Sequence, residues 1–157
     1  MQKLSFYLRL HVTKIFWRIV MPPRMLYWRL FRPKTRGVKT VISYGREVLL
    51  VRLNYAHKQW AFPGGGVGRG EDWKTAALRE AKEETGITLT DAVEIGEYVN
   101  TVVYKIDTVH IFHSKLSVKI NPTADGMEIA EAAWFPIDQL PHNRIPRVDM
   151  IIQLAAF

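Results

Sequence analysis

A glycine-rich loop that runs directly into a helical segment is the feature that most constrains the fold of this chain. Five glycines lie between residues 64 and 70, and such a loop loses much conformational entropy unless neighbouring groups order it. Glu71 or Asp72 can cap a helix that begins just after the loop. Gly86 is placed to end that helix as a C-cap. The sequence therefore predicts an ordered loop followed by a helix that runs to about Thr85.

Three glutamates of this predicted helix share one face. Glu80, Glu83 and Glu84 follow the spacing i, i+3, i+4, which sets their carboxylates about one turn apart. Like charges at this spacing destabilise a helix slightly, and Arg79 can pair with Glu83 at i+4. Solvated faces of this kind are common, so the glutamates alone leave two interpretations open. They are either a surface in water or oxygen ligands for Mg²⁺ or Mn²⁺.

The glycine loop favours the second interpretation. Backbone without side chains can come close to a cation and to a phosphate group. Ions held between clustered carboxylates and phosphates polarise the phosphorus, stabilise the leaving oxygen and lower the pKa of a bound water. The residues therefore indicate a divalent-metal site for phosphoryl chemistry.

The spacing over residues 65–87 resembles the Nudix box at every fixed position. The match consists of Gly65, five residues, Glu71, seven residues, Arg79-Glu80-Ala81, one residue, Glu83-Glu84, one residue and Gly86-Ile87. This pattern is long and specific, and the flanking segments at residues 60–63 and 128–136 are also similar to the family. Over roughly residues 38–155, the chain is identified as a member of the Nudix hydrolase family.

This resemblance implies a fold and a reaction. The fold would be an α/β/α sandwich with a mixed sheet, formed by residues 37–157. The reaction would be metal-dependent pyrophosphohydrolysis, in which water attacks phosphorus in a nucleoside diphosphate linked to another moiety. The alternative is a catalytically inactive Nudix fold that serves as a nucleotide-binding or membrane-associated adaptor module. The sequence contains no further motif that selects one pyrophosphate substrate.

The resemblance also implies which residues would bind the metal. Glu83 and Glu84 would be the main ligands of Mg²⁺ or Mn²⁺, and Glu80 would be a further ligand or the general base. The Gly65 carbonyl would complete the coordination.

Other residues would support this site or supply the base. Arg79 would orient the carboxylates, and Glu71 would support them through a water molecule. The general base varies within the family, and some members take it from a late loop, which makes Glu128 and Glu131 candidates. Both could instead simply flank a strand.

Several aromatic and histidine side chains could contact a substrate. Tyr55, Trp60 and Phe62 precede the box, where an aromatic ring could stack on a base, and His110 and His113 lie on one expected strand. Packing within the domain is the alternative for each of them.

The remaining apolar segments predict a mixed α/β layer structure. Strands are expected over residues 38–43, 47–53, 92–103, 108–118 and 129–135, with a short extended segment at 59–62, a helical turn at 136–140 and a closing helix at 147–156. Pro33 to Gly37 is expected to be the linker into this domain.

The positive charge of the chain is concentrated near its start. The formal charge is +7, yet residues 1–46 carry eleven Lys or Arg and no acid, so the other 111 residues carry eleven bases and fifteen acids. Residues 1–36 are also rich in aromatic side chains and predict a helical arm. Residues 1–31 of this arm could lie on an anionic membrane surface. Packing on the domain, a homodimer contact and a targeting peptide are alternatives, while nucleic-acid binding is not favoured.

The absence of cysteine excludes several kinds of chemistry. Disulfides, cysteine-ligated zinc and thiol catalysis are all ruled out for this chain. We expect a cytoplasmic protein, peripherally bound to a membrane if the arm is interfacial.

Overall fold

The computed structural model describes residues 23, 30, 33–54, 58–101, 105–124, 126 and 128–157. The chain divides into two units, Met1–Thr35 with Val99–Asp107, and Arg36–Tyr98 with Thr108–Phe157. In the first unit, the Thr35 hydroxyl donates to Asp107 Oδ1 at 2.5 Å. The second unit, called the main unit below, contains the box. The predicted helical arm falls almost entirely outside the described residues.

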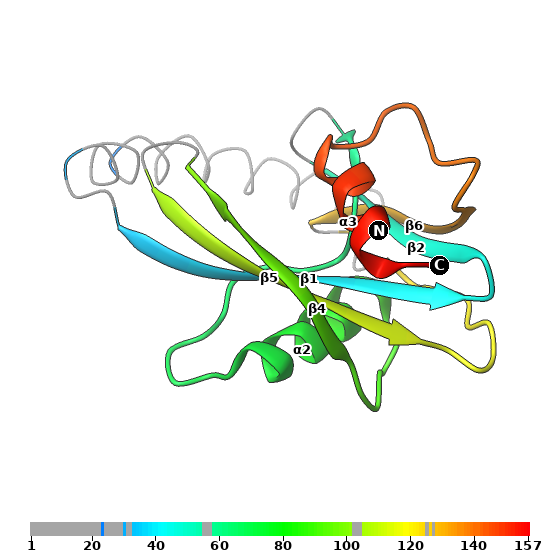
Figure 1. The fold of residues 1–157 in the computed structure, drawn as a ribbon, viewed down its shortest axis with the longest axis horizontal. Helices are drawn as coiled ribbons and strands as arrows, with labels where there is room; N and C mark the ends of the chain where they lie inside the picture. Colours follow the sequence, from blue (N-terminus) through cyan, green and yellow to red (C-terminus); the bar gives the residue numbers. More distant parts are fainter. Residues whose placement is uncertain are drawn as a thin grey trace, which may run out of the picture. The chain divides into compact units, whose positions relative to one another are not determined.

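Strands of the described residues form one sheet with the order β3-β2-β1-β5-β4, and β6 also pairs with β2 (Figure 1). Their bounds are β1 Lys34–Tyr44, β2 Glu47–Leu53, β3 Trp60–Ala61, β4 Val93–Asn100, β5 Ile106–Lys115 and β6 Ile129–Pro136. The pairs β1–β2, β2–β3 and β2–β6 are antiparallel, and an isolated bridge between Trp60 and Arg144 is parallel. Strand β2 is central, which agrees with its continuous apolar sequence.

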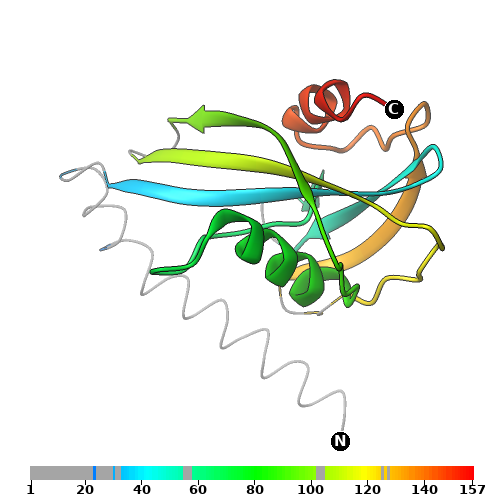
Figure 2. The same cartoon turned by 60° about the horizontal axis from the view of Figure 1, so that its bottom comes forward.

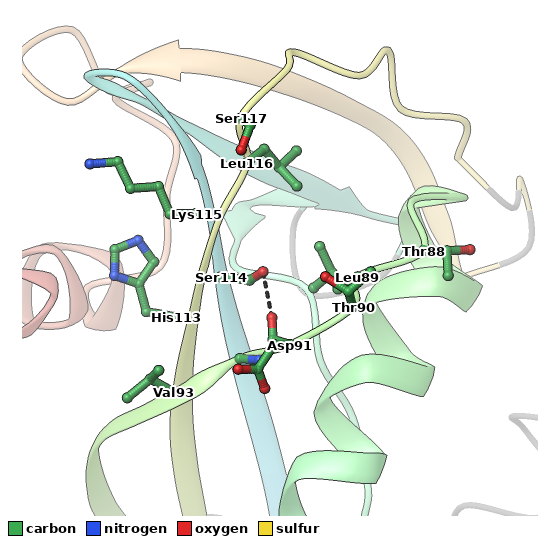
Figure 3. Close-up of a pocket in the computed structure, with 11 residues that line it drawn as sticks. Thr88, Leu89, Thr90, Asp91, Val93, His113, Ser114, Lys115, Leu116 and Ser117 are labelled. Atoms are coloured by element: carbon green, nitrogen blue, oxygen red, sulfur yellow. Dashed lines mark hydrogen bonds between the residues drawn. The ribbon is translucent and has the colours of Figure 1, made fainter.

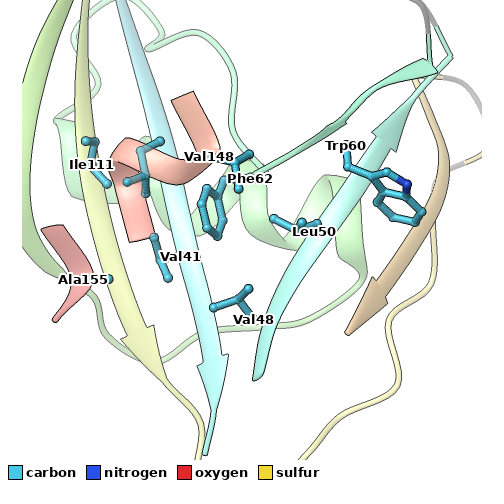
Figure 4. Packing of buried hydrophobic residues seen from close by; sticks show 9 residues of the cluster. Val41, Val48, Leu50, Trp60, Phe62, Ile111, Val148 and Ala155 are labelled. Atoms are coloured by element: carbon cyan, nitrogen blue, oxygen red, sulfur yellow. The ribbon is translucent and has the colours of Figure 1, made fainter. Parts of the chain in front are cut away.

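Two helices cover opposite faces of this sheet in the main unit (Figures 1 and 2). Helix α2, Trp73–Thr85, lies on one face, and helix α3, Arg147–Ala155, lies on the other. Alternate residues of the strands therefore point to different helices. Ile42 and Leu49 pack with Ala81 of α2, whereas Val41, Val48 and Leu50 pack with residues of α3. Figure 4 shows the apolar side chains packed between the sheet and α3, where the Phe62 side chain lies between the strands and the helix.

Local signals set the ends of α2. The Asp72 side chain caps the first turn by accepting from the Thr75 amide at 3.0 Å. Gly86 ends the helix in the left-handed conformation, with φ of 70°, and its amide donates to Lys82 O. Ala76, Ala77 and Ala81 face the sheet and are fully buried, so small side chains allow the helix to lie close to the strands.

The predicted α/β sandwich is confirmed, with local differences. Strands were expected over residues 92–103 and 108–118, whereas β4 ends at Asn100 and β5 spans Ile106–Lys115. Strand β1 already begins at Lys34, so the linker expected at residues 33–37 is wrong. The strand lies beside β5 in the sheet, where the Ile106 amide donates to Pro33 O, and the Val67 amide of the glycine loop donates to Arg36 O. The helical turn expected at residues 136–140 is wrong, because β6 continues to Pro136 and only residues 137–138 form a turn. Among the described residues, no helix is long and apolar enough to cross a membrane.

Candidate active site

The glycine loop runs beside β1 as if it were a further strand. The Val38 amide donates to Gly65 O at 2.9 Å, and the Thr40 amide donates to Pro63 O at 2.8 Å. An antiparallel bridge between Gly37 and Gly66 continues this pairing. The loop is therefore ordered by the backbone of β1, which offsets the entropy cost of its glycines.

Gly64 allows this close approach. Its φ is +140°, and a β carbon at this position would lie 2.1 Å from Val38 O. Its amide donates to Glu84 Oε2 at 2.8 Å. Only glycine fits this conformation and this close approach to β1. The hydrogen bond from its amide to Glu84 links the loop to helix α2.

Glu84 is a buried carboxylate, with 7% of its surface exposed. Burial raises its pKa to about 7, although the nearby Lys39 ammonium and the Gly64 amide favour the charged form. The charges of Glu80 and Glu128 raise this pKa further. The protein groups around Glu84 therefore do not fully stabilise its ionised form, and a bound cation would stabilise it.

Arg79 joins three carboxylates. Its Nε and Nη2 donate to the two oxygens of Glu71 at 2.9 and 3.0 Å. Its Nη1 donates to Glu80 at 2.7 Å and to Glu83 at 3.0 Å, and its Nη2 also reaches Gly66 O. The hydrogen bonds to Glu71 and then to Glu80 raise the pKa of Arg79 above its usual range. The predicted pairing with Glu83 is present, and a fixed guanidinium fork orients the acidic side chains.

Glu71 anchors this fork from the loop side. It lies just before the helix cap, and its Oε2 accepts from the Gly68 amide at 2.7 Å. The hydrogen bonds from Arg79 and then from Gly68 hold the pKa of this carboxyl below its usual value. Glu71 thus supports the neighbouring carboxylates by direct contact with Arg79, and the expected water is not needed for this link.

The oxygen donors of the box suit a hard divalent cation. Glu80, Glu83, Glu84 and the Gly65 carbonyl offer only oxygen, as Mg²⁺ and Mn²⁺ prefer. The Glu80 carboxylate lies against Gly65, where a β carbon would come within 2.6 Å of its Oε2. In the described part of the chain, no three acidic or histidine side chains stand in a metal-binding arrangement. Glu80 and Glu83 face Arg79 here, so the metal ligands remain a prediction.

The two late glutamates differ in their surroundings. Glu128 precedes β6, and its charge acts on Glu84. Glu131 instead forms an ion pair with Arg52 at 2.7 Å on the surface of the sheet. The structure therefore brings Glu128 toward the box and gives Glu131 a different partner.

The aromatic residues before the box are packed in the core. Trp60 is 9% exposed and meets Phe135 edge to face, with ring centroids 4.8 Å apart, and Phe62 is 1% exposed. Both therefore follow the packing alternative, while Tyr55 lies outside the described residues.

The two histidines are engaged with protein groups. His110 stacks on Trp73 with ring centroids 3.7 Å apart, and its two ring nitrogens face Glu94 and Glu97. His113 lies 2.8 Å from the Ser43 hydroxyl, and burial lowers its pKa.

A cavity of about 360 Å³ lies beyond the C-terminal end of α2 (Figure 3). It is lined by residues 88–93 and 113–117, and the Ser114 hydroxyl donates to Asp91 O within it. None of the box carboxylates lines this cavity, so it is separate from the candidate active site.

Sequence reasoning missed two residues that act on Glu84. Gly64 precedes the first fixed position of the box, and Lys39 belongs to β1, far away in the sequence. The only signal for the second residue was that Lys39 is the one charged residue in the strand expected over residues 38–43. Their proximity to the box depends on the pairing of the loop with β1.

Comparison with known proteins indicates the same family as the sequence of the box. The NUDIX domain family matches residues 33–153. The Nucleoside triphosphate pyrophosphatase/Nudix hydrolase fusion protein of Bifidobacterium longum is 34% identical over 87 residues, which are 55% of this chain and 18% of that protein. The RNA pyrophosphohydrolase of Campylobacter jejuni is 36% identical over 95 residues, which are 59% of this chain and 55% of that protein. The chain thus spans about half or less of these two relatives.

The fold has close counterparts among solved structures. The MutT NUDIX hydrolase from Burkholderia pseudomallei superposes with a TM-score of 0.70 at 20% identity, covering 78% of this chain and 98% of that chain. At this identity the likeness concerns the fold. With the family match over most of the chain, it confirms the identification made from the box, and the chain belongs to the NUDIX family.

Proposed function

We propose that this chain is a pyrophosphohydrolase that uses Mg²⁺ or Mn²⁺ to cleave a nucleoside diphosphate linked to another moiety. The observation that carries this proposal is the buried Glu84 carboxylate, which lies near Glu80 and Glu128 behind a glycine loop. A protein retains such a costly group where a cation neutralises it. The names of the two sequence relatives, a nucleoside triphosphate pyrophosphatase fusion and an RNA pyrophosphohydrolase, support the same type of reaction.

Four groups of the box would hold the cation. These are the carboxylates of Glu80, Glu83 and Glu84 and the carbonyl of Gly65. A bound divalent ion would neutralise phosphate charge and make a coordinated water more acidic. The helix brings the three carboxylates from adjacent turns, and the loop adds the carbonyl.

The other residues would position these ligands and move a proton. Arg79 holds Glu80 and Glu83 in place, and Glu71 holds Arg79. Water would attack phosphorus, a new P–O bond would form, and the anhydride P–O bond would break. Glu80 or Glu128 would accept the proton of that water, and the charge released on the departing phosphate would be balanced by the cation.

The segment before the hydrolase domain would have a separate role. We propose that residues 1–36 form an arm outside a hydrolase domain of residues 37–157. Its lack of acids and its many aromatic and basic residues support contact with an anionic membrane. Such contact would tether the enzyme to a membrane without taking part in hydrolysis.

A product screen tests the proposed reaction. The protein is incubated with Mg²⁺ and nucleoside diphosphate derivatives, dinucleoside polyphosphates or 5′-triphosphorylated RNA, and products are identified by mass spectrometry. We expect one class to be cleaved by the wild type and spared by Glu84→Gln. Glu47→Gln is the matched control, because Glu47 pairs with Lys119 and should leave turnover unchanged. No cleavage by a folded wild type, or equal cleavage by Glu84→Gln, would contradict the proposal.

A further inference from the structure

Lys39 makes two hydrogen bonds to the segment that leads into the box. This residue lies on β1, and its half-buried side chain extends to the loop. Its Nζ donates to Phe62 O at 2.8 Å and to Gly64 O at 2.9 Å. The ammonium therefore holds two carbonyls on either side of Pro63, and hydrogen bonds from a charged donor are the stronger ones.

Gly64 transmits this contact to the helix. Its carbonyl accepts from Lys39, and its amide donates to Glu84. A glycine with φ of +140° has many other conformations available when nothing holds it. The Gly64 amide shares one planar peptide unit with the Pro63 carbonyl, which accepts from the Thr40 amide. Lys39 holds the Phe62 and Gly64 carbonyls, which belong to the peptide units on either side of that unit. Lys39 therefore limits rotation of the Gly64 amide by restraining both neighbouring peptide units.

We propose that Lys39 is a positioning residue, which holds the peptide units on both sides of the Pro63–Gly64 unit so that the Gly64 amide keeps the Glu84 carboxylate in place for the cation. The effect of Glu84 placement on the cation is the second step and rests on the proposed function. The effect of Lys39 on the loop is the first step and does not depend on that function. Lys39 lies outside the box, and the backbone of the loop carries its effect to the helix.

The competing explanation for Lys39 is a simple nearby positive charge. Such a charge repels a second cation, so at a pH where Glu84 is ionised in both the wild type and a Lys39 variant its removal would tighten binding of a divalent metal. The metal measurement is therefore made above the pH range in which Glu84 titrates. A positioning role predicts instead that removal of the Lys39 ammonium weakens metal binding, because a carboxylate that is no longer held must be ordered when the metal binds. The direction of the change therefore separates the two explanations.

Amide hydrogen exchange in the metal-free protein tests the first step. Lys39→Met keeps most of the length and the apolar stem of the side chain while it removes the donor and the charge. We expect exchange at the Gly64 amide to become faster by about tenfold or more, as loss of a charged hydrogen bond implies. Lys39→Arg retains a charged donor and should restore most of the protection. Lys119→Met is the matched control, since Lys119 pairs with Glu47 away from the loop.

Binding of Mn²⁺ alone, measured from the electron paramagnetic resonance signal of the free ion, tests the second step. We expect weaker binding by Lys39→Met and wild-type binding by Lys119→Met. Unchanged Gly64 exchange, or Mn²⁺ binding that is equal or tighter in Lys39→Met, would overturn the positioning role. A wild type that binds no Mn²⁺ would instead refute the proposed function, and the exchange result would still decide whether Lys39 holds the loop.

Discussion

Replacement of Glu84 by glutamine should stabilise the metal-free protein at alkaline pH. The folded state raises the pKa of Glu84 from 4.5 to about 7, so it binds this proton more tightly than the unfolded state does. The stability of the wild type therefore falls as pH rises from 4.5 to about 7. The glutamine side chain would carry no charge at any pH, and its oxygen can still accept from the Gly64 amide. The free energy of unfolding of the variant should therefore not fall in this way as the pH rises.

The size of the effect follows from the pKa of Glu84 in the two states. A tenfold difference in proton affinity between the folded and unfolded states corresponds to about 1.4 kcal/mol of stability. Glu84 is only 7% exposed, so solvent screening reduces this little. Between pH 5 and pH 8, the free energy of unfolding of Glu84→Gln should rise relative to the wild type by about 2 to 3 kcal/mol.

Urea denaturation of both proteins in EDTA, at pH 5 and at pH 8, measures this difference. Comparison with the variant removes the contributions of other groups, such as His113, whose lowered pKa costs stability as pH falls. Glu131→Gln is the control, and its difference from the wild type should change little with pH because the Arg52 pair is exposed. Adding Mg²⁺ at pH 8 should stabilise the wild type more than Glu84→Gln. An identical wild-type-to-variant difference at both pH values would refute the reasoning.

Three further predictions concern the rest of the site and the arm. Arg79→Lys replaces a fork by a point charge and should lower kcat about tenfold or more at saturating Mg²⁺, and a kinetic assay with the substrate from the product screen would show this. Gly64→Ala should destabilise the fold by about 1 to 3 kcal/mol in thermal or urea unfolding, because its β carbon would collide with Val38 O. Gly66→Ala has open space around the new carbon and should be tolerated. If residues 1–31 lie on membranes, the full chain should sediment with anionic vesicles at low salt and be released at high salt, whereas no sedimentation at low salt would exclude this role.

Local signals were sufficient for the helix of the box. The sequence offered Glu71 or Asp72 as the cap, and Asp72 takes this position, while Gly86 ends the helix as expected. Strand β2 was also predicted with its observed bounds, because its apolar residues 48–51 and Leu53 are typical of a central strand. These elements depend little on distant parts of the chain.

Other elements depend on pairing between distant segments. The early part of β1 looked like a linker, since Pro33, Lys34 and Gly37 disfavour regular structure locally. Pairing with β5 makes this part of the chain a strand, and the glycine loop bonds to it through Arg36 and Gly37. Pro136 was expected to begin a helical turn, but β6 extends to it through its pairing with Glu47 of β2.

The sequence by itself determined the family, the helix and the group of acidic residues on one helical face. It could not distinguish the three glutamates, because equal spacing along a helix says nothing about what covers each side chain. The tertiary structure decided that Glu84 is buried under the Gly64 amide, while Glu83 remains exposed beside Arg79. It also brought Lys39 to the loop from a distant strand. Burial and long-range hydrogen bonds determine the charge state of a carboxylate, and both exist only after the loop, strand and helix have packed together.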